Sequence, residues 1–314
     1  MIVTVTPNPS LDRTVEVESL IRGAVLRAHT ATVEAGGKGV NISRALAAHG
    51  LATRAVLPSG GAEGAQLAAL LAIPGVDVVL VPVAGSVRAN ISVVEPDGTV
   101  TKINEPGPVL SAGEIDALVA AARRAAGGSQ WVAASGSLPP GTPTDFYARL
   151  IERLAPAGCR IAVDSSGEPL LRALPLGPDV VKPNREELAE AVGRAIVTLG
   201  DAVDAAERLH EKGPRSVLAS LGADGAILVD ASGALHGEAP VEVPLSAVGA
   251  GDALLAGFLA GGGMGPLALA EGLAWGAATA SLPGSRMPGP TDLNRSAVHI
   301  HSRIDRQRRL KGAS

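Results

Sequence analysis

The residue that most directly suggests chemistry in this sequence is an aspartate that follows two glycines and precedes an apolar run. The segment reads VGAGDALLAGFL and covers residues 248–259. The apolar residues after Asp252 recur with helical spacing, so we expect a helix to begin near Asp252. Gly249 and Gly251 then lie in the preceding turn, where positive φ would leave amide groups free to bind an anion. An N-cap aspartate after a tight turn also fits these residues.

A second glycine-rich segment, EAGGKGVNISRALAAHG (34–50), leads into a helix that is expected to end at Gly50. Lys38 and Asn41 are well placed there to bind a small polar group, although a glycine turn with a solvated lysine also fits. Two familiar phosphate motifs are excluded. The dinucleotide fingerprint requires glycine at position 254, which is Leu254, and the Walker motif requires Ser or Thr where Gly39 follows Lys38.

Further polar groups follow several of the expected strands. In VKPNREEL (181–188), Asn184 and Glu187 share one face of a helix start, where they could orient a hydrated Mg²⁺ or simply cap the helix. The segments SGSLPPG (135–141) and DSSGE (164–168) lie where parallel sheets bind ligands. SLGADGAILVD (220–230) reads as a strand, a glycine turn and a second strand, which is either an ordinary hairpin or one wall of a nucleotide pocket.

Short β-branched runs alternate with helical segments rich in Ala and Leu, which predicts βαβ units. The fold class is therefore expected to be α/β, with a doubly wound, mostly parallel sheet flanked by helices. Ser111 and Glu114 predict a capping box for a helix over 111–126, and a helix over 201–213 is expected to end with Gly213 as its C-cap. The expected strands are 2–6, 54–57, 78–83, 131–135, 160–164, 179–182, 216–220 and 226–229.

Two polar-out stretches interrupt this alternation. Residues 12–34 alternate with period two, and 86–103 read as a hairpin that turns at 96–98. We interpret them as one small sheet inserted in a core of residues 1–11, 35–85 and 104–314. The inserted sheet is expected to act as a lid, and a homodimer is expected to form through it.

Composition excludes several classes of function. The net charge of −4 and an aromatic content of 2% argue against a nucleic-acid partner, and an apolar content of 46% indicates a globular chain. The single cysteine, Cys159, excludes an intrachain disulfide and fits a cytoplasmic location, as does an N-terminus with no basic signal segment. The uncharged stretch 253–270 contains GGGMGP, so we interpret it as two buried helices and expect no membrane span.

The C-terminal region is expected to be ordinary surface. His299 and His301 have no third ligand nearby in sequence, so a surface helix is favoured over a metal site. The basic tail, 303–314, is interpreted as a solvated helix end followed by fraying.

Taken in this order, the motifs resemble the PfkB/ribokinase-like carbohydrate kinases over nearly the whole chain. NPSLD and GGKGVN are similar to the branch that contains 1-phosphofructokinase and tagatose-6-phosphate kinase, and PSGGAEG (58–64) is similar to the minor 6-phosphofructokinase. The matching segments are TPNPSLDRT (6–14), GGKGVN (36–41), VRANISV (87–93), SGSLPPG (135–141), VKPNREEL (181–188), SLGADG (220–225) and VGAGD (248–252).

The resemblance implies ATP and Mg²⁺ as cofactors, a sugar phosphate as substrate, and a role for each matching residue. Asp252 would be the general base, and the amides of Gly249, Ala250 and Gly251 would receive the transferring phosphoryl group. The sugar would be bound by Asp12, Gly36, Gly37, Asn41, Asn90 and Ser137, with Arg27, Lys38 and Arg88 facing its phosphate. The nucleotide would be enclosed by Lys182, Asn184, Ser220, Gly222, Gly225, Gly251, Gly276 and Ser281, and Asn184 and Glu187 would manage Mg²⁺.

Elementary physics is consistent with these roles. Phosphoryl transfer depends mostly on positioning and charge stabilisation, which amides at a helix start supply. The same positive potential is expected to lower the pKa of Asp252.

Lys38 favours fructose 1-phosphate as substrate, because the minor 6-phosphofructokinase has glycine at that position. Fructose 6-phosphate and tagatose 6-phosphate stay open as alternative substrates. A non-catalytic sugar-phosphate sensor also stays open, although such a sensor would not need Asp252. A dinucleotide-dependent dehydrogenase is disfavoured by the missing fingerprint.

Overall fold

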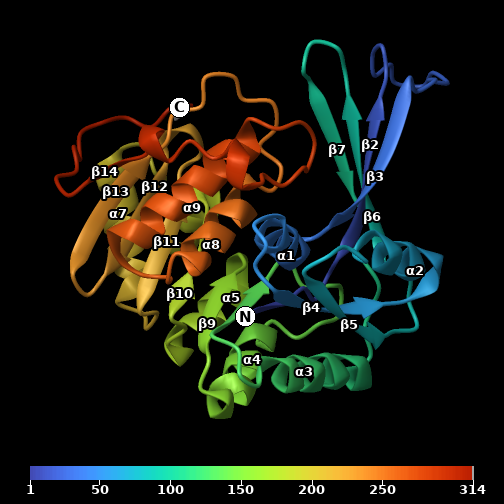
Figure 1. Cartoon of the computed structure of the whole chain (residues 1–314), viewed down its shortest axis with the longest axis horizontal. Coiled ribbons are helices and arrows are strands. Elements are labelled where there is room, and N and C mark those ends of the chain that lie inside the picture. Colours follow the sequence, from blue (N-terminus) through green and yellow to red (C-terminus); the bar gives the residue numbers. More distant parts are fainter. Residues whose placement is uncertain (313–314) are drawn as a thin grey trace.

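The computed structural model describes residues 1–312, in which two separate sheets form. Helices cover both faces of the larger sheet, and the smaller sheet projects away from it (Figure 1). This arrangement confirms the predicted α/β class. Across the larger sheet the strands are β14 (His299–His301), β13 (Gly233–Glu238), β12 (Ala226–Asp230), β11 (Ser216–Ser220), β10 (Val180–Val181), β9 (Arg160–Asp164), β8 (Trp131–Ser135), β1 (Ile2–Val5), β4 (Thr53–Ser59) and β5 (Val76–Pro82).

Seven neighbouring strands of the larger sheet run parallel, in the order β5, β4, β1, β8, β9, β10 and β11. Strands β11, β12, β13 and β14 pair antiparallel and form one edge of the sheet. The central strands β1 and β8 are buried at every residue, because helices cover both of their faces. Parallel strands bring their carboxyl ends to one edge, so the polar loops that follow β8, β9 and β10 meet there. The hairpin predicted over 220–230 is present as β11 and β12.

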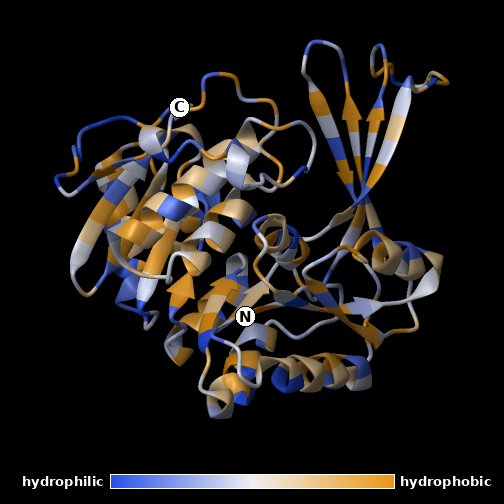
Figure 2. Cartoon of the chain, viewed as in Figure 1, coloured by the Kyte–Doolittle hydropathy of each residue, from blue (hydrophilic) through white to orange (hydrophobic). Residues whose placement is uncertain are grey.

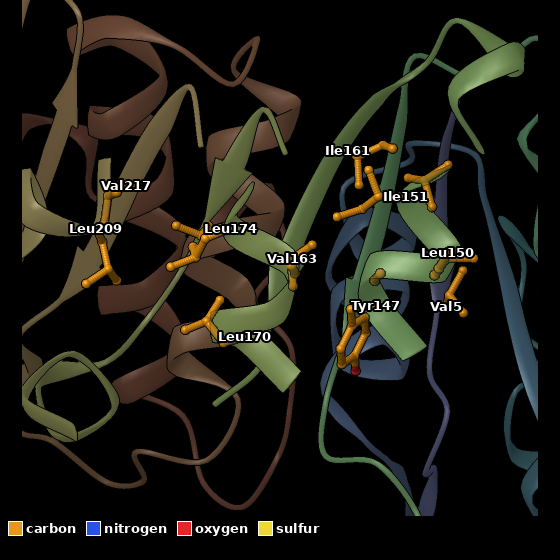
Figure 3. Packing of buried hydrophobic residues seen from close by; sticks show 14 of the residues in the cluster. Val5, Tyr147, Leu150, Ile151, Ile161, Val163, Leu170, Leu174, Leu209 and Val217 are labelled. Atoms are coloured by element: carbon orange, nitrogen blue, oxygen red, sulfur yellow. The ribbon is translucent and has the colours of Figure 1, made fainter. Parts of the chain in front are cut away.

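Apolar side chains of the helices form two main clusters, one on each face of the larger sheet. Helices α1, α8 and α9 pack on one face, and α3, α4, α5 and α7 pack on the other, where side chains of α4, α5 and α7 share one cluster with β1, β9 and β11 (Figure 3). The helices are α1 (Lys38–Ala48), α2 (Gly61–Leu70), α3 (Ala112–Ala126), α4 (Phe146–Leu154), α5 (Gly167–Ala173), α6 (Arg185–Val192), α7 (Leu199–His210), α8 (Ala250–Ala260) and α9 (Gly265–Ala280), with 3₁₀ turns at 155–157, 174–176, 222–224, 290–292 and 295–297.

Residues 253–270 belong to two packed helices, α8 and α9, joined by a glycine-rich turn. Among the described residues, no helix is long and apolar enough to cross a membrane.

The smaller sheet has the order β3 (Thr30–Gly36), β2 (Ser10–Glu16), β6 (Arg88–Val94) and β7 (Val100–Asn104). The β6–β7 hairpin turns over residues 95–99, as predicted. Its strands alternate between polar and apolar residues (Figure 2), so the two faces differ. The polar face carries Asp12, Glu34, Arg88, Asn90 and Lys102; the apolar face carries Val15, Val33, Ile91, Val93 and Ile103.

Several local predictions need correction. Helix α8 begins at Ala250, with Gly249 as N-cap, so Asp252 lies in the first turn and is not the cap. Helix α7 ends at His210, because Glu211 and not Gly213 is its C-cap. His299 and His301 lie on strand β14, which adds to the sheet edge, and not on a helix.

The C-terminal tail is also held more firmly than predicted. The Arg308 guanidinium pairs with Asp224 and Glu238, and Leu310 is buried and donates its amide to the carbonyl of Val197. Residues 306–311 therefore pack against the start of α7 and the turn between β11 and β12, and residues 313–314 of the predicted tail lie outside the described residues.

Candidate active site

A cavity of about 510 Å³ opens between the polar face of the smaller sheet and the carboxyl edge of the larger one. Three glycine-rich or polar segments contribute to it: the start of α1, the start of α6 and the start of α8. Its lining residues are Asn8, Gly37, Lys38, Asn41, Arg88, Asn90, Lys102, Gly136, Ser137, Ser165, Ser166, Asn184, Glu187, Ala247, Val248, Gly249, Gly251 and Asp252.

The start of α8 has the geometry of an anion-binding turn. Gly249 has φ +77°, a conformation that favours glycine, and a Cβ at this position would lie 2.8 Å from Cε of Met287, the movable end of that side chain. Gly251, by contrast, is helical, so only the first of the two predicted turn glycines has positive φ. Gly249 and Gly251 line the cavity, whereas the amide of Ala250 donates to the carbonyl of Ala247 at 3.3 Å.

Asp252 is buried beside this turn, where its Oδ2 accepts a hydrogen bond of 2.9 Å from Nδ2 of Asn41. Burial, and next the negative charge of Asp164, raise the pKa of Asp252 to about 7. The low pKa expected from the helix start is therefore wrong, because desolvation outweighs the favourable potential. A carboxylate that titrates near neutral pH is suited to act as a general base.

Behind the cavity, two lysines converge on one buried carboxylate. Asp164, at the end of β9, accepts from Nζ of Lys38 at 2.7 Å and pairs with Nζ of Lys182 at 3.0 Å. Burial alone would raise the pKa of Asp164, but these two ammonium groups hold it below its usual range. Lys38 also donates to Oε1 of Glu187 at 3.1 Å, and its carboxylate partners raise its pKa despite burial.

Lys38 thus lies at the end of the cavity that holds Asp164, Glu187 and Asp252. The family resemblance predicts that Lys38 faces a phosphate already present on the sugar. In the structure that cation is paired with carboxylates from β9 and α6.

Asn184 and Glu187 form a reciprocal capping box at the start of α6. Glu187 N donates to Oδ1 of Asn184, and Asn184 N donates to Oε2 of Glu187, each at 2.8 Å. The second carboxylate oxygen of Glu187 points to Lys38. Among residues 1–312, no three His, Cys, Asp or Glu side chains group as a ready-made metal site.

The smaller sheet carries a hydrogen-bonded polar cluster in which Asn90 lines the cavity, whereas Asp12 and Gly36 are not among its described lining residues. Oδ1 of Asp12 accepts from Ser10 at 2.7 Å and from Nδ2 of Asn90 at 2.9 Å. A Cβ on Gly36 would lie 2.3 Å from the Asp12 carboxylate, so glycine is required for this close approach. Arg88 donates to the carbonyls of Asn8 and Glu105, which holds its guanidinium at the rim of the cavity.

The remaining predicted residues lie elsewhere. Within the described chain, the cavity lining does not include Arg27, which is exposed in the loop between β2 and β3. Lys182 is buried next to Gly251, 3.5 Å from where a Cβ would stand. Ser220 forms a bridge with Asn184, Gly222 and Gly225 lie at the β11–β12 turn, Gly276 faces Ala250 between α9 and α8, and Ser281 is the C-cap of α9.

Three residues of the site, Asp164, Asn8 and Lys102, are not among the residues predicted from the sequence. Asp164 begins the DSSGE segment after β9, so its place at a strand end was the signal that could have selected it. Asn8 donates to the carbonyl of Pro106 and to Ser137, and it precedes β2 in the NPSLD segment. Lys102 carries no motif, and only the pairing of β7 with β6 brings it to the cavity.

Comparison with known proteins agrees with this geometry. Residues 8–285 match the pfkB family carbohydrate kinases. The chain belongs to this family. It is 41% identical to 1-phosphofructokinase of Haloferax volcanii over 307 residues, which cover 96% of this chain and 97% of that protein. It is 36% identical to ATP-dependent 6-phosphofructokinase isozyme 2 of Escherichia coli, over 81% of this chain and 83% of that protein.

Among solved structures, phosphofructokinase-2 of Escherichia coli in complex with potassium has a TM-score of 0.87 and 34% identity. The match covers 93% of this chain and 96% of that one. The predicted PfkB resemblance, the ribokinase-like fold and the assignment as a sugar kinase are thereby confirmed.

Proposed function

We propose that this PfkB kinase transfers the γ-phosphoryl group of ATP to a ketohexose phosphate, converting fructose 1-phosphate to fructose 1,6-bisphosphate. The similarity to a 1-phosphofructokinase over almost the full chain supports this substrate class. The observation that carries the chemistry is the buried Asp252 carboxylate beside the amide turn of α8, at the floor of the cavity.

In this proposal the first turn of α8 has two roles, one for its carboxylate and one for its backbone amides. Asp252 takes the proton of the attacking hydroxyl, which its pKa of about 7 allows near neutral pH. The amides of Gly249 and Gly251 stabilise the charge on the transferring phosphoryl group, and the amide of Ala250 joins them by giving up its bond to Ala247. Lys38 lies at the same end of the cavity, so its ammonium adds positive charge there instead of binding the phosphate of the sugar.

The other end of the cavity then receives the sugar phosphate. Arg88 and Lys102 are the cationic side chains of the smaller sheet that line it, and both lie on its polar face. Asp12, Asn90 and Ser137, with Asn41 across from them, offer hydrogen bonds to sugar hydroxyls; Gly36 and Gly37 allow close approach. Because Lys38 serves the opposite end, it no longer discriminates between fructose 1-phosphate and fructose 6-phosphate.

Mg²⁺ fits the donors near Glu187. This ion is usually held by one or two carboxylates together with waters and substrate phosphates, so a complete protein cage is not required. Glu187 and Asn184, at the start of α6, would hold the hydrated ion through its waters, and the ion would neutralise charge on the nucleotide phosphates. The nucleotide itself would extend from the α8 turn toward Ser220–Gly225 and Gly276–Ser281.

The smaller sheet acts as a lid in this proposal, and its outer face joins two copies of the chain. Ile103 of that face is 56% exposed, and Val15, Val33, Ile91 and Val93 lie only partly buried around it. An apolar face of this kind on a projecting sheet is typical of a protein contact. The fit of one apolar lid against another in a homodimer would also exclude water from the site.

Light scattering of two matched variants tests the dimer. Ile103→Glu places a charge on the apolar face and is expected to give monomers. Val100→Glu, on the polar face of the same strand and 47% exposed, is the control and should leave the dimer intact. A wild-type monomer, or equal behaviour of the two variants, would contradict a lid-mediated dimer.

A coupled assay of ADP release tests the substrate. Fructose 1-phosphate is expected to give a higher kcat/KM than fructose 6-phosphate or tagatose 6-phosphate. A preference for either of the other sugars would replace fructose 1-phosphate in the proposal. If none of the three supports ADP release while ATP and the sugars still bind, the sensor alternative replaces the enzyme.

A further inference from the structure

One arginine, Arg44 of α1, joins three parts of the molecule behind the sugar end of the site. Its Nη2 pairs with Oε1 of Glu34 at 3.1 Å, at the base of the smaller sheet. Its Nη1 donates to the carbonyl of Ala35 at 3.0 Å, just before the glycine pair at 36–37. The same Nη1 lies 3.4 Å from Oδ1 of Asn41 and 3.4 Å from Oγ of Ser285.

Glu34 connects this arginine to the loop after α9. Oε2 of Glu34 accepts from Oγ of Ser285 at 2.7 Å and from its backbone N at 3.3 Å. Two residues farther along that loop, Met287 contacts the Gly249 position at the start of α8. The Glu34–Arg44 pair is thus in contact with β3, α1 and the segment that abuts the catalytic turn.

The contact with Asn41 determines which way that amide points. An asparagine side chain offers one oxygen acceptor and one nitrogen donor, so the group that faces its oxygen decides where its nitrogen goes. Arg44 presents only donors, and it faces Oδ1. The NH₂ group of Asn41 therefore points the other way, to Oδ2 of Asp252 at 2.9 Å.

We propose that Arg44, held by Glu34, is a positioning residue that orients the Asn41 amide toward Asp252 and thereby couples the base of the smaller sheet to the catalytic base. This inference rests on the proposed function, in which Asp252 is the base. Arg44 itself lines no part of the cavity within residues 1–312. Its effect on turnover is therefore transmitted through Asn41.

The charges around Asp252 explain why this amide matters. Burial, and next the charge of Asp164 on β9, raise the pKa of Asp252. The ammonium groups of Lys182 and Lys38, which both pair with Asp164, lower it. Lys38 also pairs with Glu187 on α6. Asn41 is the group that donates directly to the carboxylate. A reversed amide would turn an oxygen toward Asp252, which would remove a donor and add a repulsive dipole.

A double-mutant cycle on the full-length enzyme tests the coupling. Arg44→Met is expected to lower kcat about tenfold, the usual worth of a hydrogen bond to a charged group. In the Asn41→Ala background the same change should lower kcat by less than about twofold, because the side chain through which Arg44 acts is gone. The KM for ATP should stay within about twofold in each background.

Two further variants separate positioning from general packing. Arg44→Lys keeps a cation beside Glu34 but lacks the planar fork that reaches several acceptors, so an intermediate kcat is expected. Arg54→Met is the matched control, since it also removes an arginine ion pair, with Asp77, but on strands β4 and β5 away from the cavity. This control should retain the wild-type kcat.

The relay is overturned if Arg44→Met lowers kcat equally in the wild-type and Asn41→Ala backgrounds, or leaves kcat unchanged in the wild type. Urea unfolding of the same variants provides a readout without activity, and a coupling of at least about threefold in the unfolding constant is expected. Additive unfolding effects would also overturn the relay. If the wild type shows no turnover, the proposed function fails, and the unfolding cycle alone decides the coupling. Should Arg44→Met fail to fold, the cycle is run with Arg44→Lys.

Discussion

The carboxyl edge of the larger sheet and the polar face of the smaller one both present charged groups to the same cavity, but they hold them differently. Asp164, Lys182 and Asp252 are nearly inaccessible to solvent; Asp164 pairs with Lys182, and Asp252 accepts a hydrogen bond from Asn41. Arg88 and Asn90 are half-buried, and Lys102 is exposed. Buried charges that are paired before the substrate arrives need little reorganisation during reaction, whereas exposed ones are ordered only when they bind a ligand.

This difference suggests a division of labour. In the proposed function, groups at the carboxyl edge of the larger sheet contact the reacting atoms and should act mainly on kcat. Groups on the smaller sheet contact the part of the substrate that does not react and should act mainly on KM for the sugar phosphate. A variant whose effect falls on the other constant would weaken this division.

The largest effect is expected at Asp252. Asp252→Asn preserves the shape of the side chain but cannot accept a proton, so kcat should fall about 10²–10⁴-fold, the usual worth of a general base. Steady-state kinetics gives kcat, and calorimetric titration with ATP should give a Kd close to that of the wild type. Near-normal turnover of the variant would remove Asp252 from the role of base.

Arg88→Ala should have the next largest effect, and on the other constant. Loss of one charge-assisted hydrogen bond to a phosphate is expected to raise KM for the sugar phosphate roughly 10–100-fold and to change kcat little. Arg13→Ala is the matched control, because Arg13 lies on the neighbouring strand β2 but on the apolar face. A fall in kcat with unchanged KM would assign Arg88 to the chemistry and break the division between the two sheets.

The pH dependence of kcat should reflect the buried groups of the larger sheet. The pKa of Asp252 is raised to about 7 by burial and by Asp164, and the base acts only when ionised. The value of kcat should therefore fall as pH drops below about 7, reaching roughly one tenth of its maximum at pH 6. The effect on stability has the opposite sign. Because the folded state holds this proton more tightly than the unfolded state, the contribution of Asp252 to stability is lost as pH rises through about 7. A kcat that stays constant from pH 8 to 6 would contradict this assignment.

The sequence predicted those parts of the site that depend on neighbours along the chain. The capping box of Ser111 and Glu114 is present, because its partners are three residues apart. The turn before α8 could be recognised from its glycines, although the first helical residue was placed two positions too late.

The sequence could not predict which charges would meet. Lys38 pairs with Asp164 across 126 positions, a partner that no local pattern indicates. The pKa of Asp252 depends on the same juxtaposition, since burial and Asp164 outweigh the helix start. The tail was predicted to fray because its basic residues suggested solvent, but Arg308 finds Asp224 84 positions away. Long-range partners of this kind depend on the packing of the sheet, which local patterns do not contain.

The smallest effect on catalysis is expected at the C-terminal tail. Its ion pair with Asp224 shows whether a buried charge affects turnover because it is buried or because it lies near the cavity. Asp224 is 2% exposed and pairs with Arg308, so it resembles Asp164 in burial, but it lies at the antiparallel edge of the larger sheet. Arg308→Met should lower the free energy of unfolding by about 1–3 kcal/mol, because the Asp224 carboxylate keeps its bond from the amide of Lys311 but loses its charged partner. Urea unfolding measures this loss, with the exposed Arg303→Met as control. Both kcat and KM for the sugar should stay within about twofold. A large fall in kcat would mean that buried ion pairs influence turnover wherever they lie in the larger sheet, and not only at its carboxyl edge.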